Sequence, residues 1–263
     1  MPAKTKAPRT PKAPRAAAPR MTLDEAMSAL EMAGSAQTRK TYARHGAKEP
    51  MFGVSFATLK TLMKRIGVDH ELALALWNTG NFDARNLAVK IVEPSRITSR
   101  ELDKWAGDSD VRMCLGYVGS LAAESPHAKA KAAEWLAKPA GAIRCTAWSL
   151  VGAMAMRDET TPDAWFAERL AEIERTIHSA PNAEREAMNQ ALIAIGCRNE
   201  PLRKGALAAS KRVGRVEIDH GDTACKTPDA AEYIAKTWAH STSKGFESPA
   251  AHERTRESMR RRC

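Results

Sequence analysis

The sequence is poor in aromatic residues and contains no long apolar run. Phenylalanine, tryptophan and tyrosine together make up 5% of its 263 residues. Because aromatic and β-branched residues favour strands, whereas the abundant alanine favours helices, the composition predicts an all-α fold without a sheet. No apolar run approaches the roughly 18–20 residues that a membrane-spanning helix requires, so we expect no membrane association.

Cysteine and histidine patterns typical of disulfides or metal sites are also missing. The five cysteines include no Cys-x-x-Cys pair and their number is odd, which argues against a disulfide framework and favours a reducing cytoplasm. The histidines show neither His-x-x-x-His nor His-Glu-x-x-His spacing, so we expect no metal site and no cofactor. The first residues lack the apolar segment of a secretory signal, so we expect no export.

Acidic residues are absent from the first twenty positions, and the positive charge is concentrated at the two ends. The formal net charge is +10, of which residues 1–20 contribute +6 and residues 244–263 contribute +3. The segment between them is therefore nearly neutral, at +1. Both ends are rich in Pro, Ala, Ser and charge, which predicts disordered basic tails over 1–20 and 241–263. Such tails either follow nucleic-acid phosphates or keep the protein in solution.

Helix-start signals recur along the rest of the chain. Thr22-Leu-Asp-Glu25 and Thr98-Ser-Arg-Glu101 fit the capping box, in which a hydroxyl and a carboxylate satisfy the first free amides. Three Ser-Pro or Thr-Pro pairs place a capping oxygen before a proline, at Ser125, Thr161 and Thr227. Apolar residues recur at three- and four-residue spacing, so we predict about a dozen short helices.

These helices form a repeated pair. A helix that ends in an apolar anchor, often tryptophan, is followed by a turn and by a second helix that opens with arginine, at Arg85, Arg112, Arg144 and Arg185. The arginines are 27, 32 and 41 residues apart, a loose period typical of HEAT-like repeats. Stacked pairs predict an α-solenoid over residues 21–240, with a loop and a last helix at about 216–240. We expect the tryptophans in its core and the arginines along its concave face.

Several segments in the front half of the chain carry a resemblance to the AlkD-like DNA alkylation repair family. The resemblance covers roughly residues 22–215 and rests on short segments in the family's order: Tyr42-Ala-Arg-His-Gly46, Phe52-Gly-Val54, Leu59-Lys-Thr-Leu62 and Ala84-Arg-Asn-Leu-Ala88. It implies a HEAT-like solenoid whose concave face holds duplex DNA. It also implies cleavage of the glycosidic bond of 3- and 7-alkylpurines, without a metal and without a pocket for the flipped base.

The residues that the family uses for catalysis are only partly present. The resemblance aligns the family's phosphate-binding arginine with Arg144, and its Trp-x-x-x-Asp motif with Val111 and Leu115. A later tryptophan of the family aligns with Gln190. Since leucine cannot stabilise a developing cation, the sequence predicts weak or absent glycosylase activity. Asp108 and Asp110, just before the helix, are candidate substitutes for the missing carboxylate.

A polar stretch near the end of the chain offers further candidates. Asp219, His220, Asp222 and Cys225 lie within seven residues of each other, and three interpretations compete. The side chains cap backbone groups in a turn; or an Asp or His faces the concave groove and replaces the missing carboxylate; or the residues bind a metal.

The sequence therefore predicts a monomeric protein that binds duplex or damaged DNA in its concave face. Arg144 is the first candidate for a phosphate contact, followed by Arg112, Arg185 and Arg85. We expect a cytoplasmic location on the nucleoid. The alternative, from a different class, is a HEAT-like scaffold that grips a protein partner, which suits a nearly neutral body.

Overall fold

The computed structural model describes residues 20–109 and 112–262; of residues 112–115 it describes the backbone alone. Two sequence predictions therefore fall outside the described residues: Asp110 as a substitute carboxylate, and all of the N-terminal tail except Arg20. The side chains of Arg112 and Leu115 are likewise not described.

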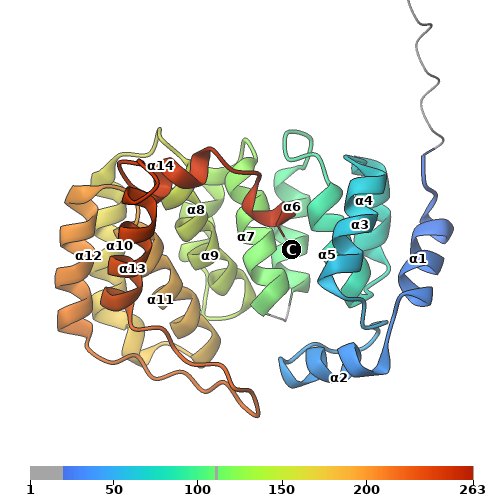
Figure 1. Ribbon diagram of the computed structural model, residues 1–263, viewed down its shortest axis with the longest axis horizontal. Coiled ribbons are helices and arrows are strands. Elements are labelled where there is room, and N and C mark those ends of the chain that lie inside the picture. The colour runs from blue at the N-terminus through green and yellow to red at the C-terminus, as the bar shows by residue number, and fades with distance from the viewer. Residues whose placement is uncertain (1–19, 110–111, 263) are drawn as a thin grey trace, which may run out of the picture.

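Helices are the regular elements of the described chain (Figure 1). It contains no strand, only an isolated bridge between Gly34 and Val54, which confirms the predicted all-α class. The elements are α1 (Leu23–Met32), α2 (Ala36–Arg44), α3 (Phe56–Ile66), α4 (His70–Asn78), α5 (Phe82–Ile91), α6 (Ser99–Asp108), α7 (Arg112–Glu124), α8 (Ala128–Leu136), α9 (Ala142–Arg157), α10 (Asp163–Thr176), η1 (Ile177–Ser179), α11 (Asn182–Gly196), α12 (Glu200–Val213), α13 (Ala230–Thr242), α14 (Pro249–Arg254) and η2 (Met259–Arg261).

The helix starts follow the sequence signals only in part. Both capping boxes form, at Thr22 before α1 and at Thr98 before α6. The predicted Ser-Pro and Thr-Pro caps are wrong, because those hydroxyls have other partners. For example, α10 has no side-chain cap and the Thr161 hydroxyl bonds to Asp158. The last long helix, α13, is capped by Asp229.

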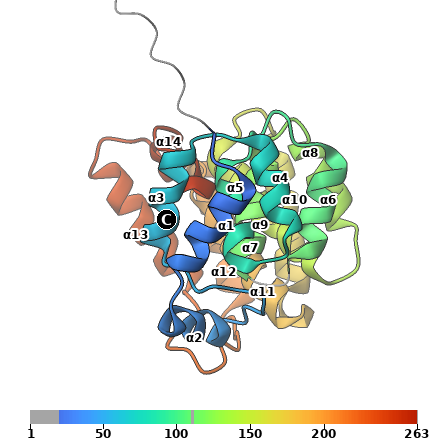
Figure 2. The same cartoon turned by 90° about the vertical axis from the view of Figure 1, so that its right-hand side faces the viewer.

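Consecutive helices pack in antiparallel pairs that stack side by side. The first helices of the pairs form an outer layer of α4, α6, α8 and α10. The second helices form an inner layer of α5, α7, α9 and α11. Figure 2 shows α6 and α8 on one side of α9 and α13 and α14 on the other. This is the HEAT-like arrangement that the repeated helix pairs predict.

The tryptophans join neighbouring repeats rather than lining a surface. Trp77 and Trp105 are fully buried and stack with ring centroids 4.2 Å apart. Three of the buried indole N–H groups donate to a carboxylate of an adjacent pair: Trp77 to Asp108 at 3.0 Å, Trp135 to Asp103 at 2.7 Å and Trp148 to Glu184 at 3.2 Å. A buried indole N–H without an acceptor is costly, so these bonds fix the register between repeats.

The C-terminal segment packs on the inner layer, so the prediction of a disordered tail over 241–263 is wrong for residues 241–262. Helix α14 lies against α9, and η2 lies against α5 and α7. Arg260 is buried and bonds through Nε to Glu124 at 2.9 Å. The buried Lys90 ammonium donates to the Arg260 carbonyl at 2.9 Å. Arg260 of this segment thus meets fixed acceptors on the inner helices, Glu124 of α7 and the Val89 carbonyl of α5, which composition alone does not reveal.

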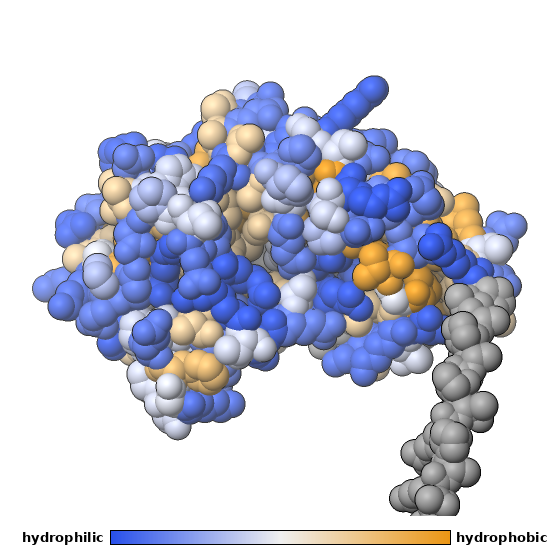
Figure 3. All heavy atoms as spheres, turned by 90° about the horizontal axis from the view of Figure 1, so that it is seen from above, coloured by the Kyte–Doolittle hydropathy of each residue, from blue (hydrophilic) through white to orange (hydrophobic). Residues whose placement is uncertain are grey.

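No helix in the described part of the chain combines the length and apolar character needed to cross a bilayer. Seen from above, the surface is mostly hydrophilic with scattered apolar patches (Figure 3).

Candidate nucleic-acid interface

A hollow opens between helix α2 and the loop of residues 214–229 (the 214–229 loop). Figures 1 and 2 both show the tip of this loop beside α2, although the two segments are far apart in sequence. The hollow, named here the α2–loop hollow, has a volume of about 830 Å³. Its walls include Thr38 and Thr41 of α2, Tyr117 of α7, Cys225 of the loop and Arg262. The hollow is thus bounded by α2, by the inner helices α5 and α7, by Cys225 of the loop and by the C-terminal segment.

Helix α2 presents a basic surface beside this hollow. Its inner side is anchored by Tyr42, whose buried hydroxyl donates to the Val54 carbonyl at 2.7 Å. The exposed side carries Arg39, Lys40 and Arg44, and the helix contains no acidic residue. Arg39 lies 3.5 Å from Glu49, whereas Lys40 and Arg44 form no ion pair within the described residues. These two cations are therefore available to an anionic ligand.

The 214–229 loop is fastened to α11 by a polar stripe. Asn182 exchanges two hydrogen bonds with the backbone of Asp219, both 2.8 Å long. Arg185 donates to the Glu217 carbonyl at 2.8 Å, and Asn189 donates to the Pro228 carbonyl at 3.1 Å. Side chains three and four residues apart share one helix face, so α11 holds the outgoing and the returning arm of the loop at once.

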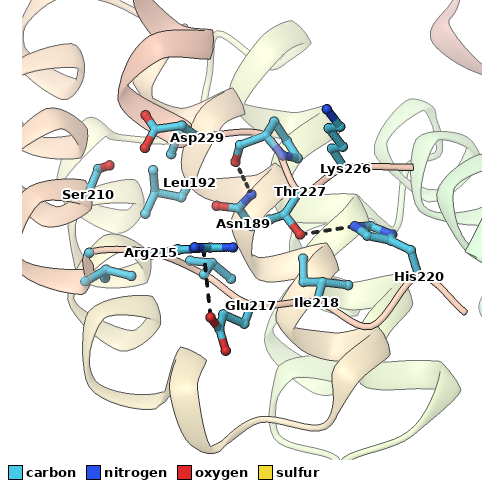
Figure 4. Close-up of a pocket in the computed structure, with 15 residues that line it drawn as sticks. Asn189, Leu192, Ser210, Arg215, Glu217, Ile218, His220, Lys226, Thr227 and Asp229 are labelled. Atoms are coloured by element: carbon cyan, nitrogen blue, oxygen red, sulfur yellow. Dashed lines mark hydrogen bonds and ion pairs between the residues drawn. The ribbon is translucent and has the colours of Figure 1, made fainter. Parts of the chain in front are cut away.

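Within the loop, the candidate catalytic side chains mainly bond to the loop itself. Asp219 accepts from the Gly221 amide at 2.8 Å, and His220 Nε2 lies 3.1 Å from the Thr227 hydroxyl (Figure 4). Asp222 is exposed and makes no hydrogen bond to a described residue. No Asp–His bond forms within the loop, and the described residues contain no cluster of three or more potential metal ligands. The geometry favours the turn interpretation for Asp219 and His220.

Arg144 is held by carboxylates of two neighbouring helices. Its Nε lies 2.8 Å from a carboxylate oxygen of the buried Glu184, and its Nη2 lies 3.5 Å from Glu172. The same Glu184 oxygen accepts the Trp148 indole N–H at 3.2 Å. The guanidinium therefore joins α9 to α10 and α11, and two negative charges lie against it.

Arg85 has a similar intramolecular role. Its Nη1 donates to the Asp108 carbonyl at 3.0 Å, and the guanidinium lies over Trp77, 5.1 Å from the ring centroid. The structure thus places Arg85, Arg144 and Arg185 each in a contact with backbone or carboxylate groups of the protein itself.

Asp108, a candidate substitute for the missing carboxylate, is part of the Arg85 contact. Burial alone would raise its pKa, but hydrogen bonds from Lys104 and Trp77 and the charge of Arg85 outweigh burial, so the pKa lies below its ordinary value. A carboxylate held ionised by three donors is suited to joining repeats and poorly suited to accepting a proton.

Three of the cysteines differ sharply in environment. Burial raises the pKa of the Cys145 thiol to about 11 and that of Cys197 to about 12. Cys225 is exposed at the rim of the α2–loop hollow. Only the thiolate reacts with common reagents, so among these three the accessible thiol is the one beside the candidate interface.

Two features of this region escape a search for catalytic residue types. The acid-free composition of Ala36–Arg44 is visible in the sequence, yet nothing local shows that this helix faces a loop near residue 220. The asparagines at 182 and 189 have ordinary helix spacing with Arg185, and their role depends on where the loop returns. Long-range juxtaposition, rather than residue type, defines this interface.

Comparisons with known proteins identify a family for this chain. A family-wide sequence profile described as "DNA alkylation repair enzyme" matches residues 26–234. Two uncharacterised proteins, Lmo0209 of Listeria monocytogenes and Lin0241 of Listeria innocua, are each 26% identical over 223 residues, covering 82% of this chain and 97% of theirs. One similar solved structure represents "a new family of proteins related to the HEAT-like repeat DNA glycosylases with affinity for branched DNA structures". It is 29% identical, with a TM-score of 0.77, and the match covers 87% of this chain and 98% of that one.

Proposed function

Because this chain belongs to the DNA alkylation repair enzyme family, we propose that it binds branched or otherwise distorted DNA at the α2–loop hollow. The family predicted from the sequence is thereby confirmed. The observation that carries the proposal is the basic, acid-free helix α2 facing a fixed polar loop across an open hollow. Exposed cations on such a surface attract the phosphate backbone.

Two further points support a binding role. The similar solved structure represents proteins with affinity for branched DNA. A DNA branch also differs from a plain duplex by presenting strands in more than one direction, and a hollow bounded by α2, the loop and the C-terminal segment has walls on several sides. Since α13, α14 and η2 cover much of the inner layer, the proposed contact lies at the open edge of the solenoid.

Base excision is not part of the proposed function. Excision of an alkylpurine needs a carboxylate beside the sugar as positive charge develops, and the family position holds Leu115. Asp108 is committed to Trp77 and Lys104. We expect no release of methylated purines above the spontaneous rate, measured on methylated duplex DNA. Efficient release that disappears on replacing Asp219 or Asp222 would contradict this.

The binding experiment compares a labelled four-way junction with a duplex of the same length over a range of salt concentrations. We expect tighter binding to the junction and a linear fall of log affinity with log salt. Replacing Lys40 and Arg44 by alanine should lower affinity for both DNAs and reduce the salt slope by about two, since each lost phosphate contact contributes about one.

The matched control replaces two exposed arginines on outer helices, Arg100 of α6 and Arg175 of α10. This variant loses the same net charge as the α2 variant and should keep the native salt slope. If the two variants lose affinity equally, binding follows net charge and the α2 site is wrong. If the native protein binds neither DNA, the protein-scaffold alternative takes its place.

A further inference from the structure

We propose that the cavity beneath the 214–229 loop receives one unpaired nucleotide of the bound DNA. This rests on the proposed function and adds a base-binding site to it. The cavity is separate from the α2–loop hollow and lies between α11, α12 and the two arms of the loop (Figure 4). Its volume is about 670 Å³, within the range of roughly 300–1,000 Å³ typical of small-molecule sites.

The walls of the cavity suit a flat ring. Leu192 and Val213 come from the two helices, and Val216, Ile218 and Pro228 come from the loop. These side chains and the proline ring supply apolar surface beside four charged residues, Arg215, Glu217, Lys226 and Asp229. Proteins that take up an extruded base commonly sandwich it between aromatic or apolar side chains and read its edge with hydrogen bonds.

Asn189 provides the group that would read the edge. Its side chain is 1% exposed and lines the cavity. Its Nδ2 donates to the Pro228 carbonyl at 3.1 Å, which fixes the orientation of the amide. Its Oδ1 is buried and has no hydrogen-bond partner among the described residues. A buried acceptor without a partner is costly, so this oxygen favours a ligand that brings an N–H donor.

Two exposed cations stand among the lining residues, Arg215 and Lys226. Lys226 forms no ion pair with a described residue. Arg215 faces only Glu217, at 3.9 Å, and both of these side chains are more than three-quarters exposed. The remaining acid, Asp229, is occupied in capping α13. A phosphate at this position can therefore pair with Lys226 and displace Glu217 from Arg215.

These features together select a nucleotide. Apolar side chains, one buried acceptor and two cations match a ring, an N–H on its edge and a phosphate. All four DNA bases carry at least one N–H donor, so Asn189 distinguishes a base from an empty position more strongly than one base from another. In a DNA branch or bulge an unpaired nucleotide is extruded at low cost, whereas in a duplex it is paired and stacked.

The test uses the full chain and labelled duplexes that carry a single-nucleotide bulge containing adenine, unsubstituted purine or an abasic sugar. Purine keeps the stacking surface of adenine but lacks its amino donor. We expect adenine to bind about tenfold better than purine, the usual scale for one buried hydrogen bond. Asn189→Leu should reduce the ratio of adenine affinity to purine affinity to about one.

A second variant guards against a folding defect in Asn189→Leu, which also loses the bond to Pro228. Val216→Trp fills the cavity from the loop, and we expect it to reduce adenine binding to the abasic level. Ala171→Trp adds the same ring at an exposed position of the outer helix α10, away from both cavities, and it should behave as the native protein does.

Equal binding of the three bulges by the native protein overturns the base site and leaves the proposed DNA binding intact. Binding of no DNA overturns both. A free nucleotide is the other source of the same chemistry, so dAMP is added alone in a thermal-shift measurement. Stabilisation by dAMP without discrimination among bulges overturns an occupant that belongs to a DNA strand.

Discussion

The contact between Arg144 and Glu184 yields a quantitative test of what the arginine does. Arg144→Ala removes the ion-pair partner of the Glu184 carboxylate, which is 3% exposed and keeps the Trp148 indole as a hydrogen-bond donor. Removing one partner of a buried ion pair costs about 3–5 kcal/mol. Arg144 is 24% exposed, so water screens the pair and we expect about 2–3 kcal/mol. In a chain of this size that lowers Tm by about 4–12 °C.

Thermal unfolding and DNA affinity, measured on the same variant, separate two roles. If Arg144 joins helices, the variant loses stability while its DNA affinity below Tm stays within about threefold of native, because no phosphate contact is lost. Arg175→Ala, on the exposed surface of α10, should change stability by less than about 0.5 kcal/mol. The reasoning is refuted if Arg144→Ala keeps the native Tm and loses one unit of salt slope, the behaviour of a phosphate contact.

Three further predictions concern other parts of the chain. In a variant with Cys114 and Cys263 replaced by serine, a thiol reagent should label Cys225 quickly, and Cys145 and Cys197 only after unfolding. Bound junction DNA should slow the labelling of Cys225. An unchanged labelling rate with DNA bound would contradict the hollow as the interface. Glu124→Ala removes the partner of buried Arg260, so amide exchange of residues 258–262 should accelerate while Glu257→Ala has little effect; equal protection in both variants would count against a docked segment. Because folding lowers the pKa of Asp108, the stabilising effect of its carboxylate is present at neutral pH and is lost as pH falls through that lowered pKa. Asp108→Asn should therefore lower the free energy of unfolding most at neutral pH. A loss of stability that grows on acidification would refute the role of Asp108 as an ionised contact between repeats.

Local patterns in the sequence predict the fold class well. The capping boxes at Thr22 and Thr98, the three- and four-residue apolar spacing and the repeated order of tryptophan, turn and arginine are all visible within one short stretch of sequence, and they predict the helix pairs. The family follows from short segments in a fixed order. These features need no knowledge of which distant residues meet.

The errors concern contacts that close over long distances. The C-terminal segment has the composition of a disordered tail, yet Arg260 is fixed by Glu124, 136 residues away. Arg85 and Arg144 have the register expected for a shared surface, and the spacing does not reveal that Asp108 and Glu184 of other helices also contact them. The sequence contains each of these acids, and only the fold shows where they lie.

The loop illustrates the same limit at the candidate site. Asp219 and His220 are the residue types of a catalytic pair. In the structure, however, the Asp219 amide donates to the Asn182 side chain, and the His220 ring bonds to the Thr227 hydroxyl. By contrast, Asn189 has no catalytic character in the sequence. Its buried, unsatisfied oxygen is apparent only once Pro228 is known to occupy its nitrogen.

The central claim is that DNA binds at the surface between α2 and the loop rather than through the basic N-terminal residues. The most direct test measures junction affinity against salt for residues 20–263, with and without the Lys40→Ala and Arg44→Ala changes. We predict that this shortened protein still prefers a four-way junction to a duplex, and that the double change removes about two units of salt slope. Loss of all binding on removal of residues 1–19, or an unchanged slope in the double variant, would contradict the account.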